Sequence, residues 1–305
     1  SFNPNNRQGL RTSSMRNRAV TDVFEPGSTM KPFVAAAALE SGRYRPDTAI
    51  STSPGWYRVG VNTVRDVHDY GQLDVTGVIR KSSNVGISKI ALSLSQESIW
   101  ELLADLGFGA QTFSGFPGEA SGLLPHYSGW NAIETATLSF GYGMSATPLQ
   151  LAQGYAVLAT GGIRRSITFV PGGQVSDERR VMSESVARQV RDMLEAATGP
   201  DGTAPQARIT GYRVAGKTGT VRKSIAGGYS EDQYLAVFAG LVPASDPRFV
   251  MVVMVDEPSA GKYYGGQVAA PVFSRVMAGT LRLMAVPPDD LPLLQTRSAD
   301  PGDSA

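Results

Sequence analysis

The 305-residue sequence predicts a mixed α+β fold in which an antiparallel central sheet is flanked by helices. Helical and strand patterns alternate along the chain without an internal repeat. The period changes in the last third, where short β-branched runs separated by turn residues favour an antiparallel meander. An alanine-rich apolar run near the N-terminus favours a helix that is buried on nearly every side. We therefore expect a helical scaffold packed around one sheet.

The buried helix is expected at residues 28–40, after a polar and extended segment over 1–27. Pro32 fits its first turn, because the first backbone N–H groups of a helix have no intrahelical partner. Gly42 suits the C-terminus of such a helix. Residues 44–70 contain several prolines and glycines, and this stretch is interpreted as rich in turns.

A helical pair is expected over residues 77–95, and the string Ser82-Ser83-Asn84 falls at the junction between its two helices. Such a junction can direct two side chains into a cleft. A Thr-Pro pair opens another helix over 149–160. Ser183 is the expected N-cap of a helix over 184–197. These last two helices are interpreted as scaffold.

The last third is expected to contain three strands and then an amphipathic helix, at residues 212–221, 234–242, 248–255 and 267–284. Residues 224–228 are the expected turn between the first two strands. The first strand carries Lys217-Thr218-Gly219-Thr220, and it must lie at a sheet edge if its backbone is to pair with a ligand. One domain is expected over 1–286, followed by a polar, partly disordered tail over 287–305.

Composition limits the classes of function. With 42% hydrophobic and 18% charged residues, the chain can bury a sizeable core. A net charge of +1 without a long basic run argues against nucleic acid as the main partner. The chain has no cysteine, and its two histidines, His68 and His126, lack ligand spacing, so we expect neither a metal nor a cofactor. The chain also lacks a start methionine, as expected of a piece of a longer protein.

Three short strings stand in a fixed order: Ser28-Thr29-Met30-Lys31, Ser82-Ser83-Asn84 and Lys217-Thr218-Gly219. Together they match the S-x-x-K, S-x-N and K-T-G set of serine acyl-transferases that open D-alanyl amides. Single strings are weak evidence, because a second S-x-x-K occurs at 259–262 and a second S-x-N at 1–3. K-T-G occurs once, and the ordered set with domain-scale spacing is therefore strong evidence.

Longer stretches around these strings extend the match, at residues 17–33, 81–86, 139–143, 147–152 and 215–220. They resemble the transpeptidase domain of class B penicillin-binding proteins, from about Phe2 to Met284. The phrase Phe24-Glu25-Pro26 is closer to the division-specific type, penicillin-binding protein 3, than to the elongation type.

The resemblance implies a peptidoglycan D,D-transpeptidase with the serine β-lactamase or D,D-peptidase fold. Its expected partners are peptidoglycan stem peptides, β-lactam antibiotics and, through parts outside this chain, cell-division membrane proteins. It also implies a location at the periplasmic face of the inner membrane with a single N-terminal anchor. The family's first sheet strands and its non-catalytic domain would lie before Ser1, so the sheet is expected to be incomplete unless other segments complete it.

The motif residues then take roles in an acylation mechanism. Ser28 is the nucleophile and Lys31 its base, which must be neutral, so burial and the nearby cation Lys217 must lower the lysine pKa. Ser82 is expected to carry the proton to the departing amine, and Asn84 to bind the substrate peptide group.

The binding groups follow from the same motifs. The backbone N–H groups of Ser28 and Thr220 are the expected oxyanion hole. The hydroxyls of Thr218 and Thr220, next to Gly219, suit the terminal carboxylate of D-Ala-D-Ala. Tyr263 and Tyr264 resemble the family's aromatic wall beside the cleft, although packing aromatics would look the same.

Three functions remain open at this point. The first is a cross-linking transpeptidase, and the second is a D,D-carboxypeptidase or serine β-lactamase, which passes the acyl group to water. The third is a β-lactam-binding sensor or scaffold module. The middle motif is Ser82-Ser83-Asn84 rather than S-D-N, and it gives no support for a water-activating carboxylate. The sequence therefore predicts a long-lived penicilloyl adduct on Ser28.

Three aspartates near His68 are interpreted as turn formers rather than as acids: Asp66, Asp69 and Asp74.

Overall fold

The computed structural model describes residues 16–170, 178–225 and 227–291. Its helices are α1 Arg18–Thr21, α2 Lys31–Glu40, α3 Val75–Lys81, α4 Asn84–Ser93, α5 Gln96–Asp105, α6 Ala132–Leu138, α7 Pro148–Ala159, α8 Glu184–Thr198, α9 Gly265–Val268 and α10 Ala270–Leu283. Its strands are β1 Ala49–Ser51, β2 Trp56–Val59, β3 Asn62–Arg65, β4 Gln72–Asp74, β5 Ile163–Arg164, β6 Arg179–Arg180, β7 Ala215–Ile225, β8 Gly228–Val242 and β9 Phe249–Asp256.

The main sheet has the antiparallel order β7-β8-β9, so the predicted meander is confirmed. In the described part of the chain β7 lies at one edge, as the position of the K-T-G string required. The hairpin between β7 and β8 is longer than expected. Its pairing runs out to Ile225 opposite Gly228, with a register shift between Arg222 and Ser224, so most of the predicted turn is strand.

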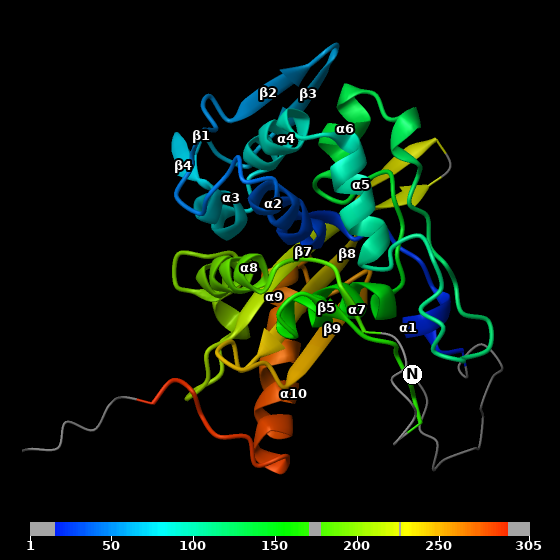
Figure 1. Ribbon diagram of the computed structural model, residues 1–305, viewed down its shortest axis with the longest axis vertical. Coiled ribbons are helices and arrows are strands. Elements are labelled where there is room, and N and C mark those ends of the chain that lie inside the picture. The colour runs from blue at the N-terminus through cyan, green and yellow to red at the C-terminus, as the bar shows by residue number, and fades with distance from the viewer. Residues whose placement is uncertain (1–15, 171–177, 226, 292–305) are drawn as a thin grey trace, which may run out of the picture.

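Helices cover both faces of this sheet (Figure 1), with α2, α7 and α8 on one side and α10 on the other. The alternation of β8 explains the two layers, because successive side chains of a strand point to opposite faces. Val237 and Ala239 pack into the larger core with the helices of the first side. Phe238 packs against Phe273 of α10 in the smaller core.

The predicted helices are present with shifted boundaries. The helix expected from residue 28 begins with the 3₁₀ turn Gly27–Met30 and becomes α-helical at Lys31. The pair over 77–95 is α3 and α4, whose junction holds the S-x-N string. Thr147 and Ser183 cap α7 and α8 with their side chains. The helix expected over 267–284 is two helices, α9 and α10, which are separated at Ala269.

Several elements had no counterpart in the sequence-based expectations. The turn-rich stretch contains the β2–β3 hairpin, together with β1, which pairs with β4. Helices α5 and α6 lie between the S-x-N string and α7. Of the extended segment expected over 1–27, residues 1–15 lie outside the described part, and α1 occupies four of the others. Within the described ranges, no helix is both long enough and apolar enough to cross a bilayer.

The start of the predicted tail is docked on the domain. Asp289 accepts hydrogen bonds from the Arg213 backbone N–H at 2.8 Å and from the Ser245 hydroxyl at 2.6 Å. Residues 292–305, on which the expectation of disorder mainly fell, lie outside the described residues.

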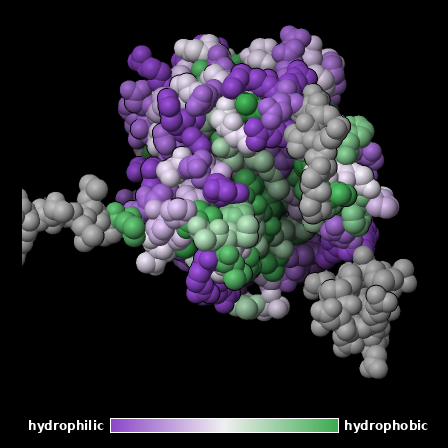
Figure 2. Space-filling model, turned by 60° about the horizontal axis from the view of Figure 1, so that its bottom comes forward, coloured by the Kyte–Doolittle hydropathy of each residue, from purple (hydrophilic) through white to green (hydrophobic). Residues whose placement is uncertain are grey.

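On the surface that carries α10, apolar side chains gather in one patch (Figure 2). Val276 and Leu283 of α10 are among the exposed apolar residues.

Candidate active site

The nucleophile candidate Ser28 lies in the tight turn that precedes α2. Gly27 has a φ of +58°, and a Cβ there would lie 2.5 Å from Val221 Cγ2 on β7. Glycine is therefore required both for the conformation and for the close approach of the strand. Tyr155 of α7 is fully buried, and its hydroxyl donates a hydrogen bond of 3.1 Å to the Thr29 carbonyl, which ties the turn to α7.

The loop after α6 that contains Gly141 and Gly143, here called the glycine loop, contacts the same turn. The Gly27 N–H donates to the Gly141 carbonyl at 3.2 Å. A Cβ on Gly141 would lie only 2.2 Å from the Gly27 carbonyl oxygen. Glu25 accepts hydrogen bonds from the Gly143 N–H at 2.9 Å and from the Tyr229 hydroxyl at 3.0 Å. The loop after α6 and the β7–β8 hairpin thus fix the backbone that carries Ser28.

Lys31 is fully buried and reaches the S-x-N string. Its Nζ donates to the Ser82 carbonyl at 2.5 Å and to Asn84 Oδ1 at 2.7 Å, and it lies 3.1 Å from Ser82 Oγ. A neutral amine has two N–H donors and one lone pair. The carbonyl and amide oxygens can take both donors, which leaves the lone pair for a hydroxyl proton. This arrangement suits a general base.

The electrostatics lower the pKa of both lysines. Burial lowers the pKa of Lys31 well below its ordinary value, and the charge of Lys217 lowers it further, while the charge of Asp66 opposes the shift. Burial also lowers the pKa of Lys217 to about 7. The sequence-based requirement that burial and a second cation depress the Lys31 pKa agrees with these directions.

Ser82 joins the three motifs. It has a φ of +59°, a left-handed conformation that is uncommon for a residue with a side chain and that clusters at functional sites. Its Oγ accepts a hydrogen bond of 2.8 Å from Lys217 Nζ and lies beside Lys31 Nζ. The structure therefore brings S-x-x-K, S-x-N and K-T-G together. Among the residues that the structure describes, the Ser28 hydroxyl has no hydrogen-bond partner.

The edge strand β7 passes directly along the nucleophile turn. A Cβ on Gly219 would lie 3.1 Å from the Pro26 carbonyl oxygen, so glycine permits this approach. The Ser28 N–H has no acceptor in the described part of the chain, as an oxyanion donor requires. On the same strand, Thr218 Oγ1 lies 2.9 Å from Thr203 Oγ1, and Thr220 Oγ1 accepts from the Gly265 N–H at 3.0 Å.

The two tyrosines predicted beside the cleft, Tyr263 and Tyr264, are both exposed and lie next to this strand. Tyr263 stacks on Tyr234 with ring centroids 4.3 Å apart, and Tyr264 lies 4.5 Å from Tyr263. Tyr264 directly precedes Gly265, which bonds Thr220. The competing S-x-x-K at 259–262 lies on an exposed loop outside any helix, and the S-x-N at 1–3 lies outside the described residues.

Sequence reasoning missed three residues around the site. Thr203 contacts Thr218, Glu25 binds the glycine loop, and Asp66 accepts hydrogen bonds from the S-x-N string. Asp66 was interpreted as a turn former. The contact between Asp66 and Asn84 joins two segments that are separated by the whole of α3, so no local sequence pattern could have predicted it. Asp74 caps α3, and Asp69 does stabilise a turn, through the Gly71 N–H.

Comparison with known proteins gives a family match over nearly the whole chain. Residues 1–278 match the penicillin-binding protein transpeptidase domain. The chain is 46% identical over 291 residues to the peptidoglycan D,D-transpeptidase FtsI of Escherichia coli, covering 95% of this chain and 49% of that protein. It is 43% identical to the probable peptidoglycan D,D-transpeptidase PbpC of Pseudomonas aeruginosa, covering 95% and 52%. The chain spans about half the length of these curated relatives.

Solved structures agree with the sequence match. The transpeptidase domain of penicillin-binding protein 3 from Burkholderia pseudomallei superposes with a TM-score of 0.86 at 43% identity. That alignment covers 91% of this chain and 84% of the other. The expected mixed fold, with its antiparallel sheet and flanking helices, is confirmed.

Proposed function

The chain belongs to the penicillin-binding protein transpeptidase domain family, and on this premise we propose that it is the catalytic domain of a septal peptidoglycan D,D-transpeptidase. The observation that carries the proposal is the meeting of Lys31, Lys217 and Ser82 beside the nucleophile turn. The substrates would be the D-Ala-D-Ala ends of stem peptides, and β-lactams would acylate the same serine.

The proposed reaction begins with attack of Ser28 Oγ on the carbonyl carbon of the penultimate D-alanine. The proton of the hydroxyl passes to the lone pair of Lys31 Nζ. The N–H groups of Ser28 and Thr220 stabilise the oxyanion, and each such donor is worth roughly 3 kcal/mol. The C–N bond then breaks, and D-alanine leaves with a proton delivered through Ser82.

The second half-reaction transfers the acyl group. An amine of a neighbouring stem peptide attacks the ester carbon and loses a proton to the same Lys31–Ser82 pair. Ser28 recovers its proton as the ester bond breaks. Asn84 Oδ1 accepts a hydrogen bond from Lys31, and Asn84 Nδ2 donates one to the Arg65 carbonyl. The second proton on Nδ2 therefore remains for the substrate peptide group.

The substrate side of the cleft has complementary groups. We propose that the hydroxyls of Thr218 and Thr220, flanking Gly219, bind the terminal carboxylate. The Gly265 N–H already donates to Thr220 Oγ1, which leaves the hydroxyl proton of Thr220 free to be donated to an anion. Tyr263 and Tyr264 would form the wall beside the scissile amide. The full-length protein would act at the periplasmic face of the inner membrane with cell-division membrane proteins as partners.

Labelling with a fluorescent penicillin followed by peptide mapping tests this proposal. We expect one labelled peptide, modified at Ser28, with an adduct that lasts for hours by intact-mass spectrometry. Loss of the adduct within seconds would favour a β-lactamase. Cross-linking of D-Ala-D-Ala stem peptides is then compared between the full-length protein and its Ser28→Ala variant. Equal yields of cross-linked product would identify the protein as a scaffold rather than the enzyme.

A further inference from the structure

Asp66 clamps the S-x-N string from outside the three motifs. Its Oδ1 accepts the Asn84 N–H at 2.5 Å and the Val85 N–H at 3.0 Å, and its Oδ2 accepts the Ser83 hydroxyl at 2.5 Å. The carboxylate therefore holds two backbone amides of the first turn of α4 and the middle side chain of the motif. Hydrogen bonds to an ionised acceptor are the strongest that a protein can place here.

The β2–β3 hairpin delivers this clamp to α4. Asp66 directly follows β3, and its own N–H donates to the Gly55 carbonyl at 2.9 Å, which closes the base of the hairpin. The preceding residue contributes as well, because the Arg65 carbonyl accepts the Asn84 Nδ2 at 3.1 Å. This bond orients the Asn84 amide, so that its Oδ1 faces Lys31.

Capping of α4 explains the two backbone contacts of Asp66 but not its bond with the Ser83 hydroxyl. The Ser83 side chain already caps α4 by accepting the Gly86 N–H at 2.8 Å. Asp66 adds a charge to a region where two lysines are buried. The charged groups that act on Lys31 from the packed elements are Lys217 of β7 and Asp66 after β3, and they act with opposite sign.

We propose that Asp66 is a positioning residue for the reaction, which fixes Ser82 and Asn84 around Lys31 and thereby aligns the proton route between the two lysines. Asp66 would touch neither the substrate nor the reacting atoms. The inference rests on the proposed function, since it assigns a residue to that same site. Its charge would also oppose the loss of the Lys31 proton, because Asp66 raises the Lys31 pKa.

The test compares Asp66→Asn with Asp69→Asn, a matched control. Asp69 lies three residues further along the same segment, and it bonds the Ser53 hydroxyl and the Gly71 N–H rather than the S-x-N string. The second-order rate of acylation by benzylpenicillin is measured from about pH 5 to 9 for the wild type and both variants. Thermal unfolding of each variant reports whether it folds.

We expect Asp66→Asn to acylate about 10- to 100-fold more slowly at the optimum, since small misplacements of catalytic groups cost this much. Its acid limb should move to lower pH, because Lys31 loses a neighbouring negative charge. Asp69→Asn should match the wild type in both respects. Asp66→Glu should recover the position of the acid limb even where the longer side chain slows the reaction.

A wild-type rate for Asp66→Asn would overturn the proposal. So would a slower reaction with an unmoved acid limb, since that result would assign Asp66 to support of the fold only. A wild-type protein that is not labelled on Ser28 would instead contradict the proposed function itself. The two failures are therefore distinguishable in one set of measurements.

Discussion

Lys31 and Lys217 are both fully buried, and each donates to hydroxyl, carbonyl or amide oxygens rather than to a carboxylate. In the described residues neither lysine takes part in an ion pair within 4.0 Å. Burying a charge without a partner is costly, so both side chains lose affinity for their protons instead. The chemistry of the site depends on this cost.

Stability should therefore rise with pH in the alkaline range. Lys217 has a pKa of about 7 in the folded protein against an ordinary value of 10.5, so the unfolded chain binds more protons between these values. The Lys217 contribution to the free energy of unfolding should increase by up to ~1.4 kcal/mol per pH unit above about pH 7. Denaturant unfolding at pH 7 and 9 measures the total slope. Lys217→Met should reduce it but not abolish it, since Lys31 has a lowered pKa of its own, and an unchanged slope in that variant would refute the assignment.

Lys31→Met should separate activity from stability. Removing the base should slow acylation by roughly 10²- to 10⁴-fold. The folded protein should keep most of its stability at pH 7, because methionine fills the site and removes a group that must lose its proton, which partly offsets the donor lost by the Ser82 carbonyl and Asn84 Oδ1. Stopped-flow acylation and thermal unfolding check the two halves. A variant that is strongly destabilised but acylates normally would show that Lys31 is structural.

At the scale of elements, the site is the meeting point of α2, the α3–α4 junction and β7. The S-x-N string lies where one helix ends and the next begins, and the K-T-G string lies on an edge strand. Both placements followed from local patterns: a break between two apolar helical faces, and a β-branched run with glycines. The 3₁₀ start of α2 was not predicted, and its contact with the Gly141 carbonyl joins distant segments that no local pattern connects.

Elements without a strong local period were missed. Strands of three or four residues such as β1 and β2 lie among prolines and glycines and show no usable alternation. Helix α5 did carry a signal, since Ile99, Leu102 and Leu103 have helical spacing. The contact of Asp66 with Asn84 follows only once the β2–β3 hairpin is placed, so the motif residues were predictable and their supports were not.

The glycine loop offers a paired test at this scale. Gly141 and Gly143 both have positive φ, but a Cβ meets the Gly27 carbonyl at 2.2 Å in the first case and nothing within 4 Å in the second. Gly143→Ala should cost only the conformational penalty of roughly 1–2 kcal/mol. Gly141→Ala should cost more and should also slow acylation of Ser28. Equal losses of stability and equal acylation rates in the two variants would contradict the clamp.

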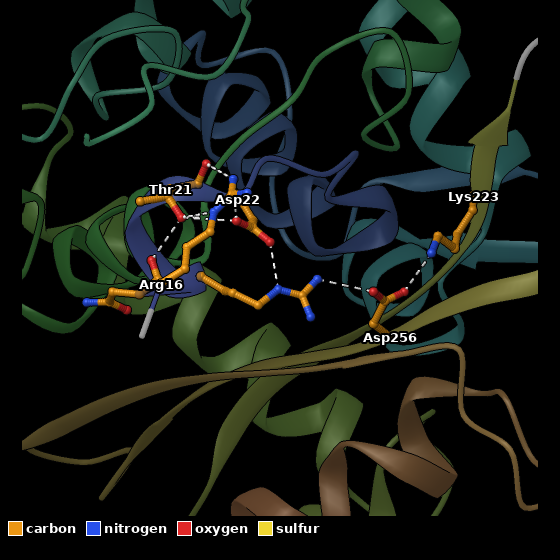
Figure 3. A network of polar contacts seen from close by, with 7 residues as sticks. Arg16, Thr21, Asp22, Lys223 and Asp256 are labelled. Carbon is orange, nitrogen blue, oxygen red and sulfur yellow. Dashed lines mark hydrogen bonds and ion pairs between the residues drawn. The ribbon is translucent and has the colours of Figure 1, made fainter. Parts of the chain in front are cut away.

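At the scale of the whole molecule, an ion-pair network joins the chain before the nucleophile to the last residue of β9 and to β7 (Figure 3). Arg18 of α1 bonds Asp22 and reaches Asp256 of β9 at 3.2 Å, and Asp256 bonds Lys223 of β7 at 2.9 Å. Most of these side chains are partly solvent-exposed, so each pair contributes little energy.

The outer edge of β9 is the open part of this architecture. No other strand of the described chain pairs with it, and most of its apolar side chains are only half-buried. We propose that preceding segments of the full-length protein add strands there. A longer chain that carries them should melt higher, by roughly 2–4 °C for each kcal/mol gained. Scanning calorimetry of both chains tests this, and equal midpoints would count against the added strands.

The proposed mechanism requires Lys31 to be an uncharged amine beside Ser28 at neutral pH. NMR titration of ¹³Cε-labelled lysines, with the Lys31 signal assigned through its absence in Lys31→Met, measures this directly. The Lys31 signal should move to the position of the neutral amine at a pH well below 10.5. A Lys31 signal that stays in the ammonium position up to pH 10 would contradict it.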